Sequence, residues 1–451
     1  MTALKADLRL AFELTRGSDR GEWWRVTLTA AGAALATGFA LAAVALASLR
    51  GQYNVPVAAG LLNQPGTRSG VIVGLMLLLV PVLGFLGQCA RIGAVHRDRR
   101  LAGLRLAGAT AWQVRRIAAL ETGLACLLGS AVATVSSVPL LLRLWDRPTV
   151  LAWVGIALVA AGVPLLGAAA GALALRRVVA SPLGRVRRLG PRTGRGPGLL
   201  FLAGVVLVGV VTLVAVLSTS SAAPGRPYAG PPLMMVGTVL AVGAGAVWLS
   251  GAAAKVTGRI LAARARSAAA LIAAERLRDD PWAAARTHAA VLLVTVVGGG
   301  FTGVRAVLLD EVRSGKQLAE SPGYYITGLD LTGVAIAVAL AVTLSGLAVG
   351  TAESLATRRR GLAAQVAAGV PRAVLGRALL LETALPLAPA VLLAGLGGTA
   401  VAAGYALLTG HPFPWAAALV PLAVYAACLI AAATSLPLLG RSVRPAELRY
   451  A

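Results

Sequence analysis

The chain has 451 residues, of which 58% are hydrophobic and only 13% are charged, about half the charged fraction of an ordinary soluble domain. Its formal net charge is +25, with 42 lysine and arginine residues against 17 acidic ones. A soluble core would need polar-faced helices around it, which this composition does not supply, so a soluble globular protein is excluded. A basic balance also suits nucleic-acid binding, but the charge is divided among short segments between apolar blocks, and we expect no nucleic-acid partner.

Ten apolar blocks of roughly 20 residues follow one another along the chain, and that length spans a bilayer core as a helix. Most of them lack charge in the middle and are rich in Leu, Val, Ala and Gly. The sequence therefore predicts an all-α fold, a polytopic membrane protein with about ten transmembrane helices. The predicted spans are 27–49, 70–92, 118–142, 150–175, 198–218, 231–252, 288–309, 330–353, 379–406 and 413–439.

Lysine and arginine residues are distributed unevenly between the two sides of this predicted bundle. If the N-terminus lies in the cytoplasm, the inner segments hold 34 of the 42 basic residues. Short basic loops resist translocation, so this ratio predicts that both termini are cytoplasmic. The inner segments are then 1–25, 91–117, 176–197, 253–287, 355–378 and 441–451.

The segment from Arg97 to Leu124 recurs in altered form from Arg358 to Leu385, at a constant offset of 261 positions. The first copy reads RDRRLAGLRLAGATAWQVRRIAALETGL and the second reads RRRGLAAQVAAGVPRAVLGRALLLETAL. A fixed offset over so long a window indicates duplication of a structural unit. The identities kept in register include Arg97/Arg358, Arg99/Arg360, Leu101/Leu362, Gly108/Gly369, Arg116/Arg377 and Glu121/Glu382.

Each copy follows one plan: an amphipathic helix with its apolar side in the inner membrane interface, two spans, a basic segment and two further spans. We expect two four-helix units with the same orientation, related by a pseudo-twofold axis along the membrane normal. Spans five and six form a two-helix insert. The predicted domains are the first unit, 1–176, a basic linker with spans five and six, 177–262, and the second unit, 263–451.

Each basic segment combines arginines with a glycine at a fixed place. Gly108 and Gly369 fall at a predicted break between two short helical pieces, where a Cβ would hinder the turn. A loop that only fixes membrane orientation would need positive charge but no fixed register. We therefore favour a docking role for both segments over a purely topological one.

A glutamate stands at the cytoplasmic mouth of the span that follows each segment. Glu121 and Glu382 suit the positive end of a helix dipole, and we expect them to pair with Arg116 and Arg377, five residues earlier. Proton coupling, which the cost of acids near a membrane would suggest, and direct contact with a partner protein are the alternatives.

The sequence contains no motif for catalysis or for binding a cofactor. The patterns GxxxxGK[ST], HExxH and GxSxG are absent, and the three cysteines fall inside predicted spans, so we expect neither a metal site nor a disulfide framework. We therefore expect a chain that is not an enzyme and holds no cofactor. Energy from ATP would have to come from a separate ATPase subunit.

These residues resemble a known family. The stretch LAGLRLAGAT from Leu101, QVRR from Gln113 and the following Glu121 are similar to the FtsX-like permease family, whose domain is shared by MacB-type ABC transporter permeases. The resemblance covers about residues 70–176 and, more weakly, 330–440. Two positions depart from the family pattern. The family usually has an acidic residue eight positions before the glycine, where this chain has Arg100 in the first copy and Gly361 in the second. The second copy also has Gln365-Val366 where the first has Leu104-Arg105.

The resemblance implies a multi-pass subunit of the bacterial cell membrane that docks a homodimeric cytoplasmic ABC ATPase, with ATP and Mg²⁺ bound on that partner. Segments 95–117 and 356–378 would be coupling helices that transmit ATP-driven motion into the membrane. Two units in tandem would supply both halves of the permease, without the large extracytoplasmic domain that related ten-span permeases carry. The ATPase-coupling residues would be Arg97, Arg99, Leu101, Leu104, Arg105, Gly108, Arg116, Glu121, Arg358, Arg360, Leu362, Gly369, Arg377 and Glu382.

Two functions follow from this resemblance. The first is an ABC transporter permease that exports or extracts a lipid-like or amphipathic substrate from the membrane. The second is a membrane subunit that signals or acts as a scaffold, transmitting ATPase motion without transport. A third interpretation, an ion-coupled carrier, is disfavoured because no span centre carries the cluster of Asp, Glu, His or Asn that an ion site requires.

Overall fold

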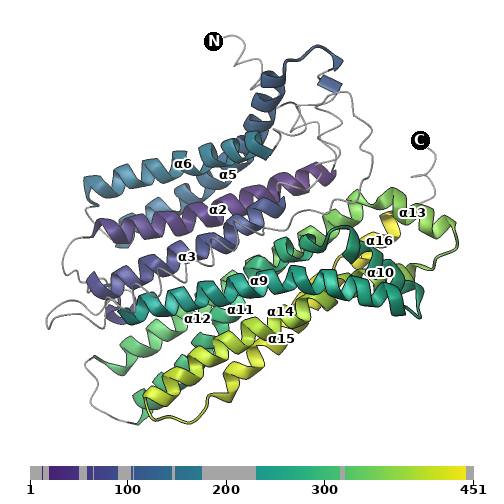
Figure 1. The fold of residues 1–451 in the computed structure, drawn as a ribbon. Coiled ribbons are helices and arrows are strands. Elements are labelled where there is room, and N and C mark those ends of the chain that lie inside the picture. The colour runs from purple at the N-terminus through teal and green to yellow at the C-terminus, as the bar shows by residue number, and fades with distance from the viewer. Residues whose placement is uncertain are drawn as a thin grey trace. The chain divides into compact units, whose positions relative to one another are not determined.

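The computed structural model describes Glu13 and residues 20–49, 58–63, 65–89, 103–104, 106–144, 148–174, 230–314 and 320–442. Every regular element in these ranges is a helix, so the predicted all-α class is confirmed for this part of the chain (Figure 1). In chain order the elements are α2 (Arg20–Ser48), the 3-10 helix η1 (Ala58–Gly60), α3 (Pro65–Cys89), α5 (Ala111–Leu144), α6 (Val150–Ala174), α9 (Gly230–Arg264), α10 (Ala268–Asp279), α11 (Pro281–Arg313), α12 (Pro322–Thr357), α13 (Arg359–Ala367), α14 (Arg372–Leu408), α15 (Trp415–Ala433) and α16 (Leu436–Ser442).

Among the described residues, seven helical segments are long and apolar enough to cross a membrane. They coincide with seven predicted spans, and α3 and α9 coincide with two more, the second and the sixth. The fifth predicted span, 198–218, lies outside the described residues. The chain is thus a multi-pass membrane protein, and the total of ten spans stays a prediction. The seven segments are Trp23–Ser48, Trp112–Arg143, Val150–Ala169, Thr287–Arg313, Pro322–Thr357, Arg372–Leu408 and Trp415–Gly440.

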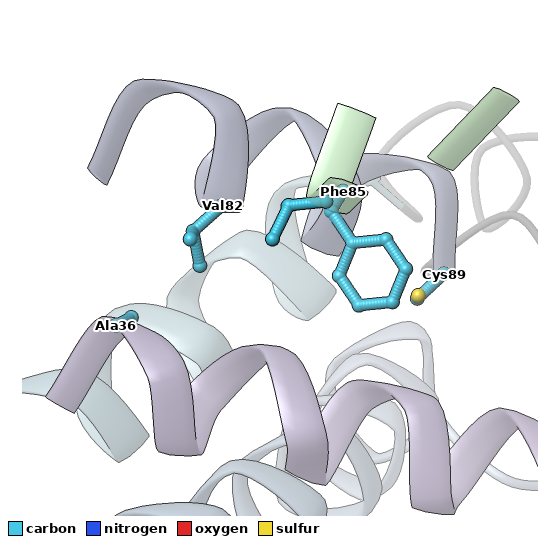
Figure 2. Close-up of a cluster of buried hydrophobic side chains, with 5 residues drawn as sticks. Ala36, Val82, Phe85 and Cys89 are labelled. Carbon is cyan, nitrogen blue, oxygen red and sulfur yellow. The ribbon is translucent and has the colours of Figure 1, made fainter. Parts of the chain in front are cut away.

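The described residues of 1–188 and 320–357 form the first of two compact units. Within it α2 packs against α3, α5 and α6, α5 also packs against α6, and α3 packs against α12 (Figure 1). One buried cluster joins three of these helices: Val82, Phe85 and Cys89, which share a face of α3, meet Ala36 of α2 and Val342 of α12. Figure 2 shows the Val82 and Phe85 side chains directed toward α2.

The crossing of α2 and α5 depends on a glycine. A Cβ placed on Gly129 would lie 2.8 Å from the carbonyl carbon of Ala30 and 2.9 Å from the amide nitrogen of Ala34, closer than real Cβ atoms come. Small residues allow such close backbone approach between membrane helices. The next residue, Ser130, donates a hydrogen bond of 3.0 Å to the carbonyl oxygen of Ala160 and so ties α5 to α6.

The described residues of 189–319 and 358–451 form the second unit. Here α11 packs against α14, and both of them contact α9 and α15. A Cβ on Gly398 of α14 would lie 2.6 Å from the carbonyl oxygen of Val296 and 3.1 Å from the amide nitrogen of Gly300, both in α11. At the offset of 261, Gly129 corresponds to Ala390 and not to Gly398. The point of closest helix approach has therefore shifted between the two copies.

The amphipathic helix α10 packs on protein along its apolar side. Its N-terminus is capped by Ser267, whose hydroxyl accepts a hydrogen bond of 3.3 Å from the amide of Ala270. Ala269, Ala273 and Leu277 are buried, and α10 contacts α9 and α14. We expected this side to face lipid, but it faces protein, because alanine side chains let α10 approach both neighbours closely. Most of the corresponding N-terminal segment lies outside the described residues.

The helices of the two sequence copies correspond at the offset of 261 positions. Arg20 and Pro281, the first residues of α2 and α11, stand at that offset, and so do Ala111 and Arg372, the first residues of α5 and α14. Helices α3 and α12 also overlap at this offset, yet they lie in one compact unit and pack against each other. The compact units thus differ from the sequence copies in the placement of α12. The pseudo-twofold relation between the copies stays a prediction.

Candidate functional site

The first basic segment ends in a helical turn that is closed by Gly108. This residue has a φ of 97°, in the left-handed region that favours glycine. The amide of Ala109 donates a hydrogen bond of 2.9 Å to the carbonyl oxygen of Leu104, and the amide of Ala107 donates one of 2.9 Å to Gly103. A hydrogen bond that spans a left-handed glycine in this way is the Schellman arrangement, which ends helices.

The second segment, helix α13, ends in the same way. Gly369 has a φ of 90°, and the amide of Val370 donates a hydrogen bond of 3.0 Å to the carbonyl oxygen of Gln365. At the offset of 261, this donor and acceptor correspond to Ala109 and Leu104. The predicted break at both glycines is therefore confirmed, and the backbone forms one kind of turn at both places.

The long helices that follow the two turns begin with different chemistry. At the start of α5, the backbone amide of Thr110 donates a hydrogen bond of 2.8 Å to the side-chain oxygen of Gln113. The backbone amide of Gln113 donates one of 3.2 Å back to the Thr110 hydroxyl. This reciprocal pair is a capping box. Helix α14 instead follows Pro371, which has no side-chain cap. The shape of the turn is kept while its sequence differs.

We expect Gly369→Ala to open the second turn. No heavy atom lies within 4 Å of a Cβ built there, so the strain is purely one of backbone conformation. A left-handed non-glycine residue costs roughly 1–2 kcal/mol. The exposed residue Arg372 follows the turn, so trypsin cleavage after it should become faster. Gly361→Ala, at another open site in α13, is the control and should not speed cleavage. Equal rates in both variants would contradict the role of the left-handed glycine.

The third turns of α5 and α14 bury equivalent faces. In α5 the hydroxyl of Thr122 donates a hydrogen bond of 3.1 Å to the carbonyl oxygen of Ala118. In α14 the hydroxyl of Thr383 donates one of 3.3 Å to Leu379, at the same offset. All four residues are buried. The threonine beside each glutamate is thus satisfied within its own helix, which leaves the glutamates to contact other helices.

Glu121 forms a buried ion pair with Arg25 of α2. Its side chain is 2% exposed and that of Arg25 is 5% exposed, and a guanidinium nitrogen of Arg25 donates a hydrogen bond to a carboxylate oxygen of Glu121. Taking two charges out of water is expensive unless they are paired. The pair therefore fixes the N-terminal end of α5, the end predicted to face the cytoplasm, against α2. It also places the carboxylate away from the surface.

Glu382 joins three helices. Its two carboxylate oxygens accept hydrogen bonds of 2.9 and 3.1 Å from the Nη1 atom of Arg358, the residue that precedes α13. The Nη1 atom of Arg276 in α10 lies 3.4 Å from one of those oxygens. Burial lowers the pKa of the Arg276 guanidinium, Glu382 raises it, and the nearby Arg358 lowers it. Glu382 thus holds two cations that would otherwise repel each other.

The remaining predicted site residues divide between the interior and the surface. Leu362 is only 2% exposed, so it anchors α13 to the rest of its unit. Leu104 and Arg116 are half-buried, whereas Arg360 and Arg377 are exposed. Four of the predicted residues lie outside the described part of the chain: Arg97, Arg99, Leu101 and Arg105.

Sequence reasoning selected Arg358, which holds Glu382, but it did not select Arg25 or Arg276. Glu382 pairs with Arg358 and Arg276 and not with Arg377, five residues earlier, while the pairing of Glu121 with Arg116 stays a prediction. Arg25 and Arg276 come from α2 and α10. One signal for Arg25 was present: it stands 261 positions before Arg286, outside the best-matched window. For Arg276 no comparable signal exists, because its offset partner is Thr15.

The fold and these contacts define a multi-pass helical membrane protein with two glycine turns, each leading into a long helix that carries an anchored glutamate. Residues 75–183 match the family model for the FtsX-like permease C-terminal domain. Residues 75–183 are therefore similar to the C-terminal domain of FtsX-like permeases, a family of membrane components of ABC-type systems that generally work with a cytoplasmic ABC ATPase. Searches among curated proteins and among solved structures gave no match.

Proposed function

We propose that this chain is the permease subunit of an ABC transporter that exports or extracts a lipid-like or amphipathic substrate. A separate cytoplasmic ATPase, a homodimer, binds ATP and Mg²⁺ and supplies the energy, while this chain itself catalyses no reaction. Ten spans with both termini in the cytoplasm place the two turns on the side of the ATPase. The membrane is the bacterial plasma membrane, and one chain supplies both halves of the permease.

The observation that carries the proposal is the repeated turn with its anchored glutamate. A docking element must be held firmly enough for its displacement to move a membrane helix. Arg358 sits at the start of α13, and its guanidinium holds Glu382, which lies ten residues into α14. Charge-assisted hydrogen bonds of this kind are stronger than neutral ones. A push on α13 would therefore reach α14 through the ion pair as well as through the chain.

Affinity purification of the tagged full-length chain from its native membranes tests the class. We expect a stable complex with a protein that carries Walker motifs, and ATP hydrolysis by that protein should be stimulated by the chain. Gly108→Pro combined with charge reversal at Arg97 and Arg99 should abolish both effects. If that variant retains ATPase association and ATP turnover, the assignment of the first segment as a coupling element is wrong.

Loss of the Glu382 carboxylate should uncouple the permease while the ATPase remains bound. In Glu382→Gln, Arg358 and Arg276 lose their shared anion, so α13 is held less firmly to α14. We expect stimulation of ATP hydrolysis to fall about tenfold, the change in rate that roughly 1.4 kcal/mol of activation free energy produces, with little change in the dissociation constant. The double variant Arg358→Glu/Glu382→Arg should recover part of the stimulation that each single change removes.

The matched control for this experiment is Glu275→Gln in α10. Glu275 pairs with Arg278 at 2.8 Å, but both side chains are at least half exposed, and exposed pairs contribute little. This variant should stimulate the ATPase like the original chain. Equal losses in Glu275→Gln and Glu382→Gln would mean that any missing charge in this region weakens the complex, which contradicts a positioning role for Glu382.

Transport and pure mechanotransmission are separated by reconstitution. In vesicles that contain the complex, a transporter should release or flip a fluorescent lipid in an ATP-dependent manner. Glu382→Gln should reduce that movement together with ATP turnover. ATP hydrolysis that is stimulated by the chain but moves no lipid would instead support the alternative, a signalling or scaffold subunit driven by the ATPase.

A further inference from the structure

The two turns present different side chains on the same backbone. Leu106, before Gly108, is 74% exposed, and Trp112, in the first turn of α5, is 66% exposed. At the offset of 261 the second turn has Ala367 and Ala373 in these positions, and both are exposed. Among the described residues of the two turns, exposed large apolar side chains thus occur at the first turn only, although the hydrogen bonds that shape the two turns correspond.

The second turn exposes several arginines. Its surface includes Arg360, Arg372 and Arg377, all exposed. At the first turn Arg116, the offset partner of Arg377, is half-buried, and Ala111 replaces Arg372. The described residues of the second turn therefore expose arginines but no large apolar side chain comparable to Leu106 or Trp112.

Two exposed large side chains beside a turn need a partner that removes them from water. Lipid is one candidate, because tryptophan favours the membrane interface. However, lipid surrounds both copies, and in the predicted topology both turns lie on the same side of the membrane, so lipid contact gives no reason for alanine at one turn and leucine or tryptophan at the other. A protein cleft that receives only the first turn does give such a reason. Buried tryptophan anchors dominate the binding energy of many protein interfaces.

We propose that Leu106 and Trp112 are the apolar anchors with which the first turn seats in a hydrophobic cleft of one ATPase subunit. The second turn contacts the other subunit through its arginines and acidic groups of the partner. The two subunits of the ATPase are therefore held unequally by a single permease chain. This inference rests on the proposed function and adds to it the chemistry and the asymmetry of the contact.

The test is a binding measurement with the full-length chain in lipid nanodiscs and the purified ATPase that co-purifies with it. Leu106→Ala/Trp112→Ala should weaken binding about 30-fold, which corresponds to the loss of one interface hot spot. The binding that remains should fall steeply with added salt, because it depends on exposed arginines. Trp415→Ala is the control: Trp415 is 76% exposed in α15, on the predicted outer side, and its loss should leave the dissociation constant unchanged.

A gain-of-contact variant keeps the test independent of folding. Ala367→Leu/Ala373→Trp gives the second turn the side chains of the first, and it should tighten binding or restore it in the Leu106→Ala/Trp112→Ala background. If the original chain binds the ATPase and Leu106→Ala/Trp112→Ala binds equally well, the anchors are wrong while the proposed function stands. The anchors are also wrong if Leu106→Ala/Trp112→Ala alters only stability in lipid. If the original chain binds no ATPase, the proposed function itself fails.

Discussion

Arg25→Met is expected to destabilise the protein by about 3–5 kcal/mol, the cost of removing one partner from a buried ion pair. The substitution keeps most of the side-chain volume but removes the Arg25 guanidinium from the carboxylate of Glu121, whose side chain is only 2% exposed. The change should appear as a lower midpoint of unfolding when the protein is titrated with SDS in mixed micelles. The double variant Arg25→Met/Glu121→Leu should recover much of the loss, because the buried carboxylate is then removed as well.

Arg278→Met provides the matched control. It removes the pair with Glu275, whose side chains are 50% and 54% exposed, and an exposed pair is worth about 1 kcal/mol or less. An unfolding midpoint for Arg25→Met that equals the one for Arg278→Met would show that the buried pair does not hold α5 against α2. A double variant less stable than Arg25→Met alone would argue that Glu121 is held mainly by groups other than Arg25.

Gly129→Ala is expected to separate α2 from α5. The new Cβ would meet backbone atoms of Ala30 and Ala34, which cannot rotate aside as a side chain would. Inserting atoms into a packed interface costs about 1–3 kcal/mol, and backbone neighbours favour the upper end of that range. The measurement is again the SDS midpoint, together with the fraction of protein that elutes as a single species after solubilisation.

Gly162→Ala in α6 isolates the packing effect from helix propensity. A Cβ there has nothing within 4 Å, so the substitution removes only the roughly 1 kcal/mol by which glycine disfavours a helix. Gly162→Ala should therefore be neutral or slightly stabilising. A Gly129→Ala protein as stable as the Gly162→Ala protein would contradict the close α2–α5 crossing.

Local features of this protein could be predicted from sequence because they depend on neighbouring residues. The break at Gly108 and Gly369 follows from a glycine between two helical pieces, and the structure has a left-handed residue at each. Hydropathy likewise located the helices, since a span needs only a continuous apolar block. The resemblance to the FtsX-like permease family could be seen because its motif is local too, within the residues 75–183 that the family model matches.

Features that depend on how helices meet could not be predicted in this way. The partners of Glu121 and Glu382 come from α2, α10 and the start of α13, at separations of 96, 106 and 24 residues. An amphipathic pattern such as that of α10 has an apolar side in lipid and in protein alike, so the pattern does not say which of them covers it. Glycines that permit close crossings, such as Gly129, look in sequence like any other glycine of an apolar helix.

The packing of α3 against α12 has a consequence for how such a chain changes over evolutionary time. In a symmetric homodimer a surface meets its own copy, so each mutation is present on both sides of the contact. Here α3 and α12 correspond by sequence offset, yet they are encoded separately, and a mutation alters one side only. Natural selection can therefore act separately on α3 and on α12, and on the turn that follows each of them. Two corresponding segments encoded separately within one gene can thus specialise in a way that a homodimer cannot reach.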